Sequence, residues 1–220
     1  MSSGMTTKAH EHWVSSLRPL LLHRGDSWDA LSRRCDQIIL FGSQAAGVQR
    51  EGSDLDLLCI GSGKSHLSPA VDLVFVTLTE VKGSRWLGCE LAGHVAHYGI
   101  WLKGEPDWVS QVRLSSHAIE RKRDKILHRL RAVEERFQYL DASYLSKYLM
   151  LIRRDLQRYE CLTNGEPVPP SPKLDQRWSQ VRDTRNELRH LADQARIDSK
   201  FLLERLSIRE RWSVDTRSLK

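Results

Sequence analysis

Three acidic residues and a glycine-serine pair are the side chains of this chain best suited to chemistry. Asp54 and Asp56 alternate with apolar residues, and Asp72 begins the next apolar run. Because a strand has a period of two, the first two carboxylates are expected on one face, where Asp72 can join them. Like charges held that close are costly unless a cation separates them, and Mg²⁺ prefers carboxylate oxygens. The three residues therefore predict a magnesium site.

Gly42 and Ser43 lie where an apolar run ends and a short helix is expected to start. Glycine lets the backbone approach a phosphate closely, and the amides and hydroxyl of such a turn can bind phosphate oxygens. A triphosphate held between this turn and the carboxylates would be set for in-line attack at phosphorus. For such a reaction the protein mainly supplies positioning and charge neutralisation.

The elements that must position these residues change character near residue 112. Before it, short apolar runs predict strands and longer amphipathic patterns predict helices; after it, apolar residues recur only at helical spacing. Expected strands are 37–41, 55–60, 71–76 and 99–102, and expected helices are 8–23, 28–34 and 84–97, with Ser27 as a cap. Asn164-Gly165 and a proline-rich segment break the later helices, and two more are expected at about 174–192 and 196–209.

The predicted fold class is therefore α+β, with a small mixed-sheet domain followed by an all-α helical bundle. We place the first domain at residues 1–112 and the helical bundle at residues 113–220.

The order of Gly-Ser, ten residues, Asp-x-Asp and a later strand carboxylate resembles the polymerase-β-like nucleotidyltransferase superfamily. The match covers about residues 37–102. The resemblance implies that Asp54 and Asp56 hold two Mg²⁺ ions, and that Asp72 completes the site as metal ligand, as general base or as both. It also implies nucleotide-binding roles for the remaining motif positions, Gly42, Ser43 and Ser53.

One position departs from the pattern of many small members of that superfamily. They carry arginine directly after Gly-Ser, whereas this chain has Gln44. A triphosphate contact is then weakened or comes from another residue, such as Arg50. The separation of Asp56 and Asp72 is also short, which leaves little room for an intervening helix.

The sequence RNELRH at residues 185–190 resembles the Arg-Asn-x-x-x-His motif of HEPN domains, which are helical bundles. The resemblance implies that Arg185, followed by Asn186, stabilises phosphate charge, and that His190 acts as acid or base. Many HEPN domains are ribonucleases, and some pair with small nucleotidyltransferases in toxin–antitoxin systems. Similar bundles in antibiotic nucleotidyltransferases only bind substrate. Both readings stay open, and Ala192 replaces a tyrosine that is modified in some paired toxins.

The charge of the chain is unevenly distributed. Residues 1–110 hold 10 basic and 12 acidic residues, whereas residues 111–220 hold 24 and 16. A basic second half favours an anionic macromolecular partner, although basic helices are often only solvated. The run of basic residues from Arg121 to Arg131 fits either interpretation.

Three further patterns set limits on the class of protein. His94 and His97 are three residues apart on an expected helix and could form a zinc pair, but helix packing is the favoured use. GSGKS at residues 61–65 lacks the first glycine of a phosphate-binding P-loop, because Leu58 occupies that position. The chain has no apolar run long enough for a membrane span or a secretory signal, which predicts a cytoplasmic protein without a membrane partner.

The sequence thus predicts a metal-dependent transferase of a nucleoside monophosphate, with AMP from ATP as the first choice among nucleoside triphosphates. The acceptor would be a hydroxyl on a small molecule such as an antibiotic, on a protein or on RNA. The alternative is a HEPN-type ribonuclease or toxin–antitoxin module in which the first domain is regulatory. A homodimer is one option for the assembly.

Overall fold

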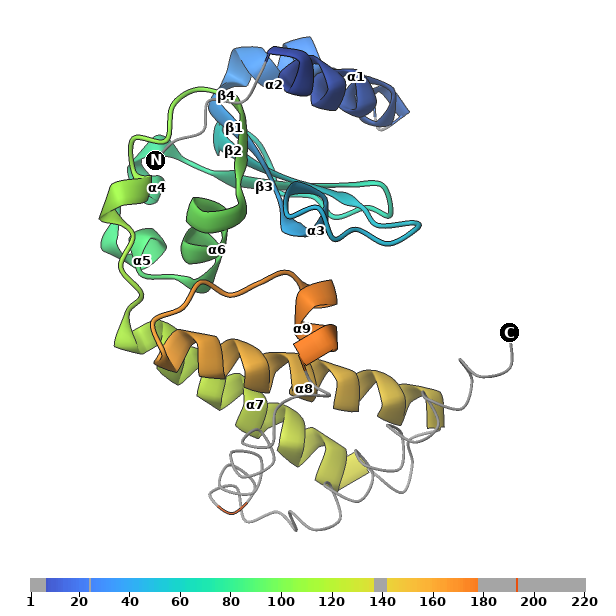
Figure 1. The fold of residues 1–220 in the computed structure, drawn as a ribbon, viewed down its shortest axis with the longest axis vertical. Helices are drawn as coiled ribbons and strands as arrows, with labels where there is room; N and C mark the ends of the chain where they lie inside the picture. The colour runs from blue at the N-terminus through green and yellow to red at the C-terminus, as the bar shows by residue number, and fades with distance from the viewer. Residues whose placement is uncertain (1–6, 24, 137–141, 178–192, 194–220) are drawn as a thin grey trace. The chain divides into compact units, whose positions relative to one another are not determined.

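The computed structural model describes residues 7–23, 25–136, 142–177 and 193 (Figure 1). The chain divides into two compact units. The first comprises Met1–Ala118 and Gly165–Lys173, and the second comprises Ile119–Asn164 and Leu174–Lys220. A segment that follows the long helices in sequence therefore belongs to the first unit. A single boundary after residue 112 stays a prediction.

A four-stranded mixed sheet forms the centre of the first unit. Its strands are β1 (Cys35–Phe41), β2 (Leu55–Gly61), β3 (Val71–Val76) and β4 (Ile100–Lys103). The order across the sheet is β3-β2-β1-β4, with β1 antiparallel to both β2 and β4 and with β2 parallel to β3. The four strands expected from the apolar runs are all present, which confirms the mixed-sheet α+β class.

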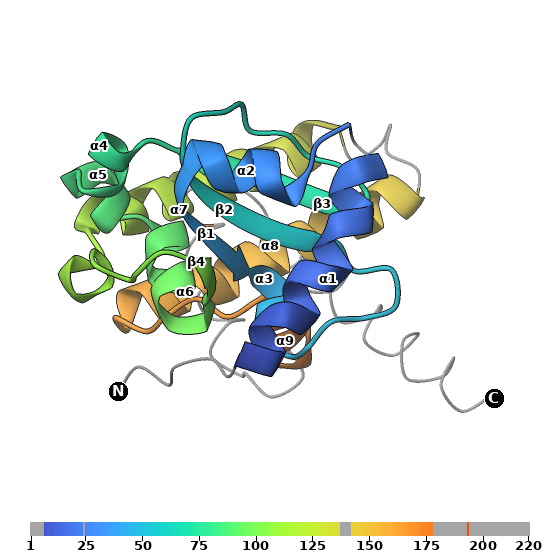
Figure 2. The same cartoon turned by 90° about the horizontal axis from the view of Figure 1, so that it is seen from above.

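Helices cover both faces of this sheet (Figure 2). Those of the first unit are α1 (Thr7–His23), α2 (Trp28–Arg34), α3 (Gly42–Ala45), α4 (Leu78–Val81), α5 (Ser84–Leu87) and α6 (Glu90–Tyr98). Leu57 and Cys59 of β2 pack on the α1–α2 side, whereas Leu58 and Ile60 pack with Val95 of α6. A strand buried on both faces explains why β2 reads as a continuous apolar run.

The ends of several helices follow local signals in the sequence. The hydroxyl of Ser27 caps α2 by accepting the amide of Ala30 at 3.1 Å, as expected. The single helix expected over 84–97 is divided, because α5 ends at Leu87 with Gly88 as its C-cap, and Cys89 is the N-cap of α6. The short helix α4 was not predicted, although Thr77 and Glu80 form a capping box that marks its start.

The described part of the second unit is helical, with two long helices and one short one. They are α7 (Ser116–Arg136), α8 (Ala142–Thr163) and α9 (Ser171–Arg177), and the division between the units falls within α7 and α9. Helix α8 ends before Gly165, whose φ of 70° lies in the left-handed region that glycine favours. The remainder of the helices expected at 174–192 and 196–209 lies outside the described residues. None of the described helices combines the length and the apolar character that a membrane crossing requires.

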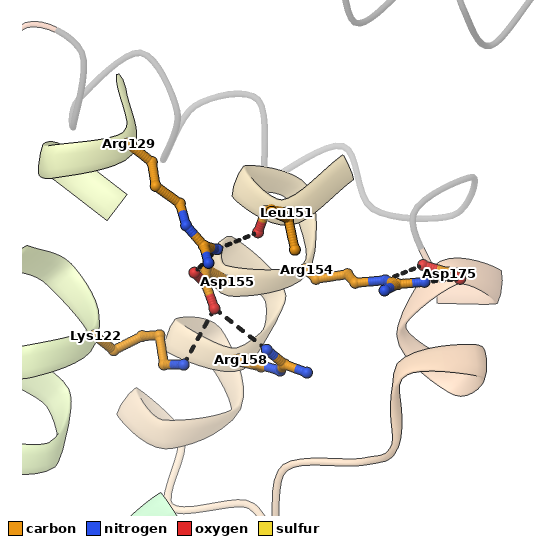
Figure 3. Close-up of polar contacts among 7 residues, drawn as sticks. All are labelled: Lys122, Arg129, Leu151, Arg154, Asp155, Arg158 and Asp175. Atoms are coloured by element: carbon orange, nitrogen blue, oxygen red, sulfur yellow. Dashed lines mark hydrogen bonds and ion pairs between the residues drawn. The ribbon is translucent and has the colours of Figure 1, made fainter. Parts of the chain in front are cut away.

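A buried ion-pair cluster joins α7 to α8 (Figure 3). The carboxylate of Asp155, which has no exposed surface, accepts from Lys122 at 3.2 Å, from Arg158 at 3.4 Å and from Arg129. Beside it, the guanidinium of Arg154 makes two hydrogen bonds of 2.9 and 2.8 Å to Asp175 of α9. Lys122 and Arg129 therefore belong neither to a solvated helix face nor to an open phosphate-binding surface, which corrects the sequence interpretation for these two positions.

Candidate active site

Strand register brings the three acidic side chains together at one end of the sheet. Asp56 is the second residue of β2 and pairs with Asp72, the second residue of β3. Asp54 lies one residue before β2 and shares the alternation of Asp56. One carboxylate oxygen from each residue lies within 4.8 Å of the other two, and all three side chains are partly exposed. The predicted convergence of Asp54, Asp56 and Asp72 is thus present in the structure.

The parallel pairing of β2 and β3 is what produces this convergence. Both acidic residues lie near the N-terminal ends of their strands, and parallel strands place those ends side by side. An antiparallel hairpin would have put Asp72 near Ile60, at the opposite end of β2. The connection over residues 62–70 contains no helix, in agreement with the short spacing.

Asp72 is held in its orientation by the turn before β3. Its Oδ1 accepts the amide hydrogen of Ser68 at 2.7 Å. The Ser68 hydroxyl in turn accepts from the amide of Val71 at 3.1 Å and donates to its carbonyl at 2.7 Å. The turn therefore holds one oxygen of Asp72 in place, and this hydrogen bond limits the rotation of the Asp72 carboxylate.

Asp56 has an electrostatic environment that opposes its own negative charge. Burial, and after it the charges of Asp54 and Asp72, together raise the pKa of the Asp56 carboxyl to about 7. A carboxylate in such a place gains most from a nearby cation, because the cation offsets both the lost hydration and the repulsion. The protein has therefore gathered negative charge where it is unfavourable without a positive ligand.

The three carboxylates fit a divalent cation in chemistry and in separation. Mg²⁺ binds oxygen ligands at about 2.1 Å, so two oxygens on one ion lie at most about 4.2 Å apart. The separation of up to 4.8 Å exceeds this by an amount that a small side-chain rotation removes. Hard oxygen donors without histidine or thiolate favour Mg²⁺ or Mn²⁺ over zinc.

Gly42 faces the carboxylates from the end of β1. Its φ is 76°, and an added Cβ would lie 2.0 Å from Oδ2 of Asp56, so two independent constraints require glycine here. Its amide donates to Nε2 of His94 at 3.3 Å. The expectation that the amides of this turn are open to phosphate is therefore wrong for Gly42. It stays a prediction for Ser43, the next residue of the turn.

Gln44 ties the glycine-serine turn to the loop that leads into β2. Its side-chain amide donates to the carbonyl of Ser53 at 3.2 Å, and the Ser53 hydroxyl accepts from the amide of Arg50 at 2.9 Å. Ser53 thus helps to close the loop immediately before Asp54. The residue that replaces the arginine of many small nucleotidyltransferases makes an internal contact instead of extending outward.

One predicted group of residues lies outside the described part of the chain, and the structure adds His94 to the surroundings of the site. Arg185, Asn186 and His190, the HEPN-like positions, lie outside the described residues. His94 was considered only for zinc or packing, and its contact with Gly42 spans 52 positions of sequence. A histidine on an amphipathic helix was the sole signal in the sequence, and it does not identify the partner.

A family model described as a nucleotidyltransferase domain matches residues 28–140, which include all three acidic residues and the glycine-serine turn. The chain belongs to this nucleotidyltransferase-domain family. The match begins at α2 and includes the whole sheet, so the nucleotidyltransferase domain contains both the fold and the acidic site described above.

Two solved structures are similar to the chain at low identity. One, described as a toxin–antitoxin crystal structure with AMP-PNP, is 21% identical with a TM-score of 0.25, covering 50% of this chain and 89% of that chain. The other, a nucleotidyltransferase-like protein from Exiguobacterium sibiricum, is 16% identical with a TM-score of 0.34, covering 78% of this chain and 69% of that chain. No curated protein matches the chain.

Proposed function

We propose that the protein transfers a nucleoside monophosphate, AMP from ATP in the first instance, to a hydroxyl acceptor in the cytoplasm. The observation that carries the proposal is the convergence of Asp54, Asp56 and Asp72 beside the Gly42–Ser43 turn in a chain of the nucleotidyltransferase-domain family. Burial and the two neighbouring carboxylates raise the pKa of Asp56, which makes the group a costly arrangement for a purely structural surface.

Each group of the site has a role in this reaction. Asp54, Asp56 and Asp72 would hold Mg²⁺, two ions by the family resemblance. The metal would neutralise triphosphate charge and polarise the phosphorus centre. The turn at Ser43 would contact the phosphates, and Asp72 would also accept the proton of the acceptor hydroxyl. A bond then forms from that oxygen to the α-phosphorus, the bond from this phosphorus to the bridging oxygen breaks, and pyrophosphate leaves.

The family and the acidic site support transfer of a nucleotide but not a choice of acceptor, because fold does not determine substrate. We propose that the helical second unit contributes to acceptor binding. The HEPN-type ribonuclease alternative depends on Arg185, Asn186 and His190, and no contact among the described residues favours it.

The test is incubation of the purified full chain with each of four α-³²P-labelled nucleoside triphosphates, Mg²⁺ and a cell extract. We expect label on one class of acceptor, highest with ATP, and release of pyrophosphate. Asp54→Asn and Asp56→Asn should abolish labelling, whereas Asp36→Asn, which alters an exposed carboxylate of β1, should not. Labelling that persists without Asp54 and Asp56, or in the presence of EDTA, would contradict the proposal.

A further inference from the structure

His94 in α6 connects two backbone segments through its two ring nitrogens. The side chain is 8% exposed. Its Nε2 accepts a hydrogen bond from the amide nitrogen of Gly42 at 3.3 Å, and its Nδ1 lies 2.7 Å from the carbonyl oxygen of Val168. A nitrogen that accepts from an amide carries no hydrogen, and one that contacts a carbonyl must donate. The two contacts therefore assign the neutral ring with the hydrogen on Nδ1.

This arrangement excludes the zinc pair considered for His94 and His97. A zinc ligand needs an imidazole nitrogen with a free lone pair directed at the metal. In His94 one nitrogen accepts from Gly42 and the other donates to Val168. The ring therefore contacts backbone and is not available as a ligand.

The segment Gly165–Lys173 belongs to the first unit and holds His94 from the other side. Val168, Pro169 and Pro170 are buried. Proline fixes its own φ and restricts the residue before it to extended backbone, so the Val168 carbonyl has little freedom to turn away. Nζ of Lys173 lies 5.2 Å above the ring of Tyr98 in α6, which is a second contact of the segment with the same helix.

The Gly42 turn needs such support because its own structure is short. Helix α3 has 4 residues, and glycine at its start has more conformational freedom than any other residue. Gln44 ties the far end of the turn to Ser53, and His94 ties the near end at Gly42. Two side-chain contacts from separate elements therefore define where the turn lies relative to Asp56.

We propose that His94 is a positioning residue for nucleotide binding, and that the segment Gly165–Lys173 completes the nucleotide site by orienting it. The inference rests on the proposed function, since it takes the Gly42–Ser43 turn as the phosphate-binding element. His94 touches no phosphate itself. It fixes the Gly42 amide, so that the following residues of the turn are already in place when a triphosphate arrives, and binding loses less conformational entropy.

The experiment compares ATP binding by three variants of the full chain. His94→Phe keeps an aromatic ring against Phe41 and Tyr98 but removes both hydrogen bonds. His94→Gln retains one acceptor and one donor, and His97→Phe is the matched control, because it alters an exposed histidine of the same helix. The readouts are the Kd of a fluorescent ATP analogue with Mg²⁺, the Kd of Mn²⁺ alone, and the Tm.

We expect His94→Phe to weaken ATP binding about tenfold or more, which is typical for losing an orienting partner of a binding group. His94→Gln should restore affinity to within about threefold of the original, and His97→Phe should not change it. Binding of Mn²⁺ alone to the three carboxylates should be the same in all of them. Partial unfolding would lower the amplitude of the ATP titration without changing its Kd.

Unchanged ATP affinity in His94→Phe would overturn the inference, as would a loss that His94→Gln does not reduce. If the original protein binds ATP in this way but transfers no nucleotide, the proposed reaction fails and the role of His94 stands. If the original protein binds no ATP, both are overturned.

Discussion

Asp56 in the first unit and Asp155 in the second are both carboxylates withdrawn from water, but their neighbours carry opposite charges. Asp155 is surrounded by Lys122, Arg129 and Arg158, so its charge is compensated by the protein (Figure 3). The charges that act on Asp56 are those of two further aspartates, and they raise its pKa instead of stabilising its ionised form. One carboxylate holds helices together, and the other belongs to a group of three acids for which the described residues show no ion pair.

The contrast shows how to separate structural acids from functional ones in this chain. The charge of a buried carboxylate that is paired with cationic side chains is compensated as soon as the protein folds, without any ligand. A group of like charges on neighbouring strands weakens the fold and persists only where something else requires it. The acidic site of the first unit is therefore better explained by a ligand than by stability.

The largest effect is expected from Asp54→Asn. It removes one charge from the site without changing the size of the side chain, and nucleotide transfer should fall about 10³-fold, equivalent to about 4 kcal/mol of transition-state stabilisation. Initial rates with labelled ATP measure this, with Asp36→Asn as control. A fall of less than tenfold would show that Asp54 is not part of the catalytic site, and the acidic group could then no longer be contrasted with Asp155 as functional.

Asp155→Ala should lower the free energy of unfolding by about 3–4 kcal/mol, because it leaves buried or half-buried cations without their shared acceptor. Denaturant unfolding followed by circular dichroism measures this. Asp124→Ala removes the exposed partner of Arg123, 3.8 Å away, and should leave stability unchanged. Mn²⁺ binding should be normal in both variants, and a stable Asp155→Ala protein would show that the cluster is not structural.

The pH dependence of stability should differ between the two regions. The folded-state pKa of Asp56 is raised above its ordinary value of 3.8 to about 7, so in this interval the folded chain binds more protons than the unfolded chain. Without metal, the contribution of Asp56 to stability therefore falls as pH rises from about 4 to about 7, by on the order of 2 kcal/mol after allowance for partial exposure.

Comparing the unfolding free energies of the original protein and of Asp56→Asn at pH 4.5 and pH 7.5, without divalent ions, isolates this contribution. Asp56→Asn should gain relative stability at the higher pH, and added Mg²⁺ should reduce the difference. A variant that is less stable than the original at pH 7.5 without metal would contradict the charge repulsion at Asp56.

The smallest effect is expected from Gln44→Glu. This change removes the amide donor to the Ser53 carbonyl and brings another negative charge toward Asp54. ATP affinity should fall about threefold to tenfold, whereas Gln44→Arg, which restores the residue of many small nucleotidyltransferases, should keep a donor at this position. Fluorescence titration with the ATP analogue measures both, and equal affinities would show that the Gln44 contact has no part in binding.

Local periodicity was sufficient to predict the strands and the shared face of Asp54 and Asp56. Asp54 and Asp56 are two residues apart, and Asp72 is the second residue of β3, so the spacing places each carboxylate near the start of its strand. Their convergence also requires that the two strands run in parallel. The parallel register of β2 and β3 could not be read from the sequence. It depends on the path of residues 62–70, which has no periodic pattern.

Long-range polar contacts could not be predicted for a related reason. His94 binds backbone groups 52 and 74 positions away, and Lys122 pairs with Asp155 after 33 positions. Such partners leave no mark on local spacing, and a lysine with a buried partner looks like any other basic residue of a helix. The HEPN-like residues lie outside the described part of the chain, so their role stays a prediction.

The proposed transferase site requires that Asp54, Asp56 and Asp72 bind a divalent cation together. Titration of Mn²⁺ into the full chain, followed by electron paramagnetic resonance at pH 7.5, measures this without any acceptor or nucleotide. We predict that the original protein and Asp36→Asn bind Mn²⁺ with equal affinity, and that Asp56→Asn and Asp72→Asn each bind it at least about tenfold more weakly. Equal binding by all four proteins would contradict the metal site and, with it, the proposed transferase.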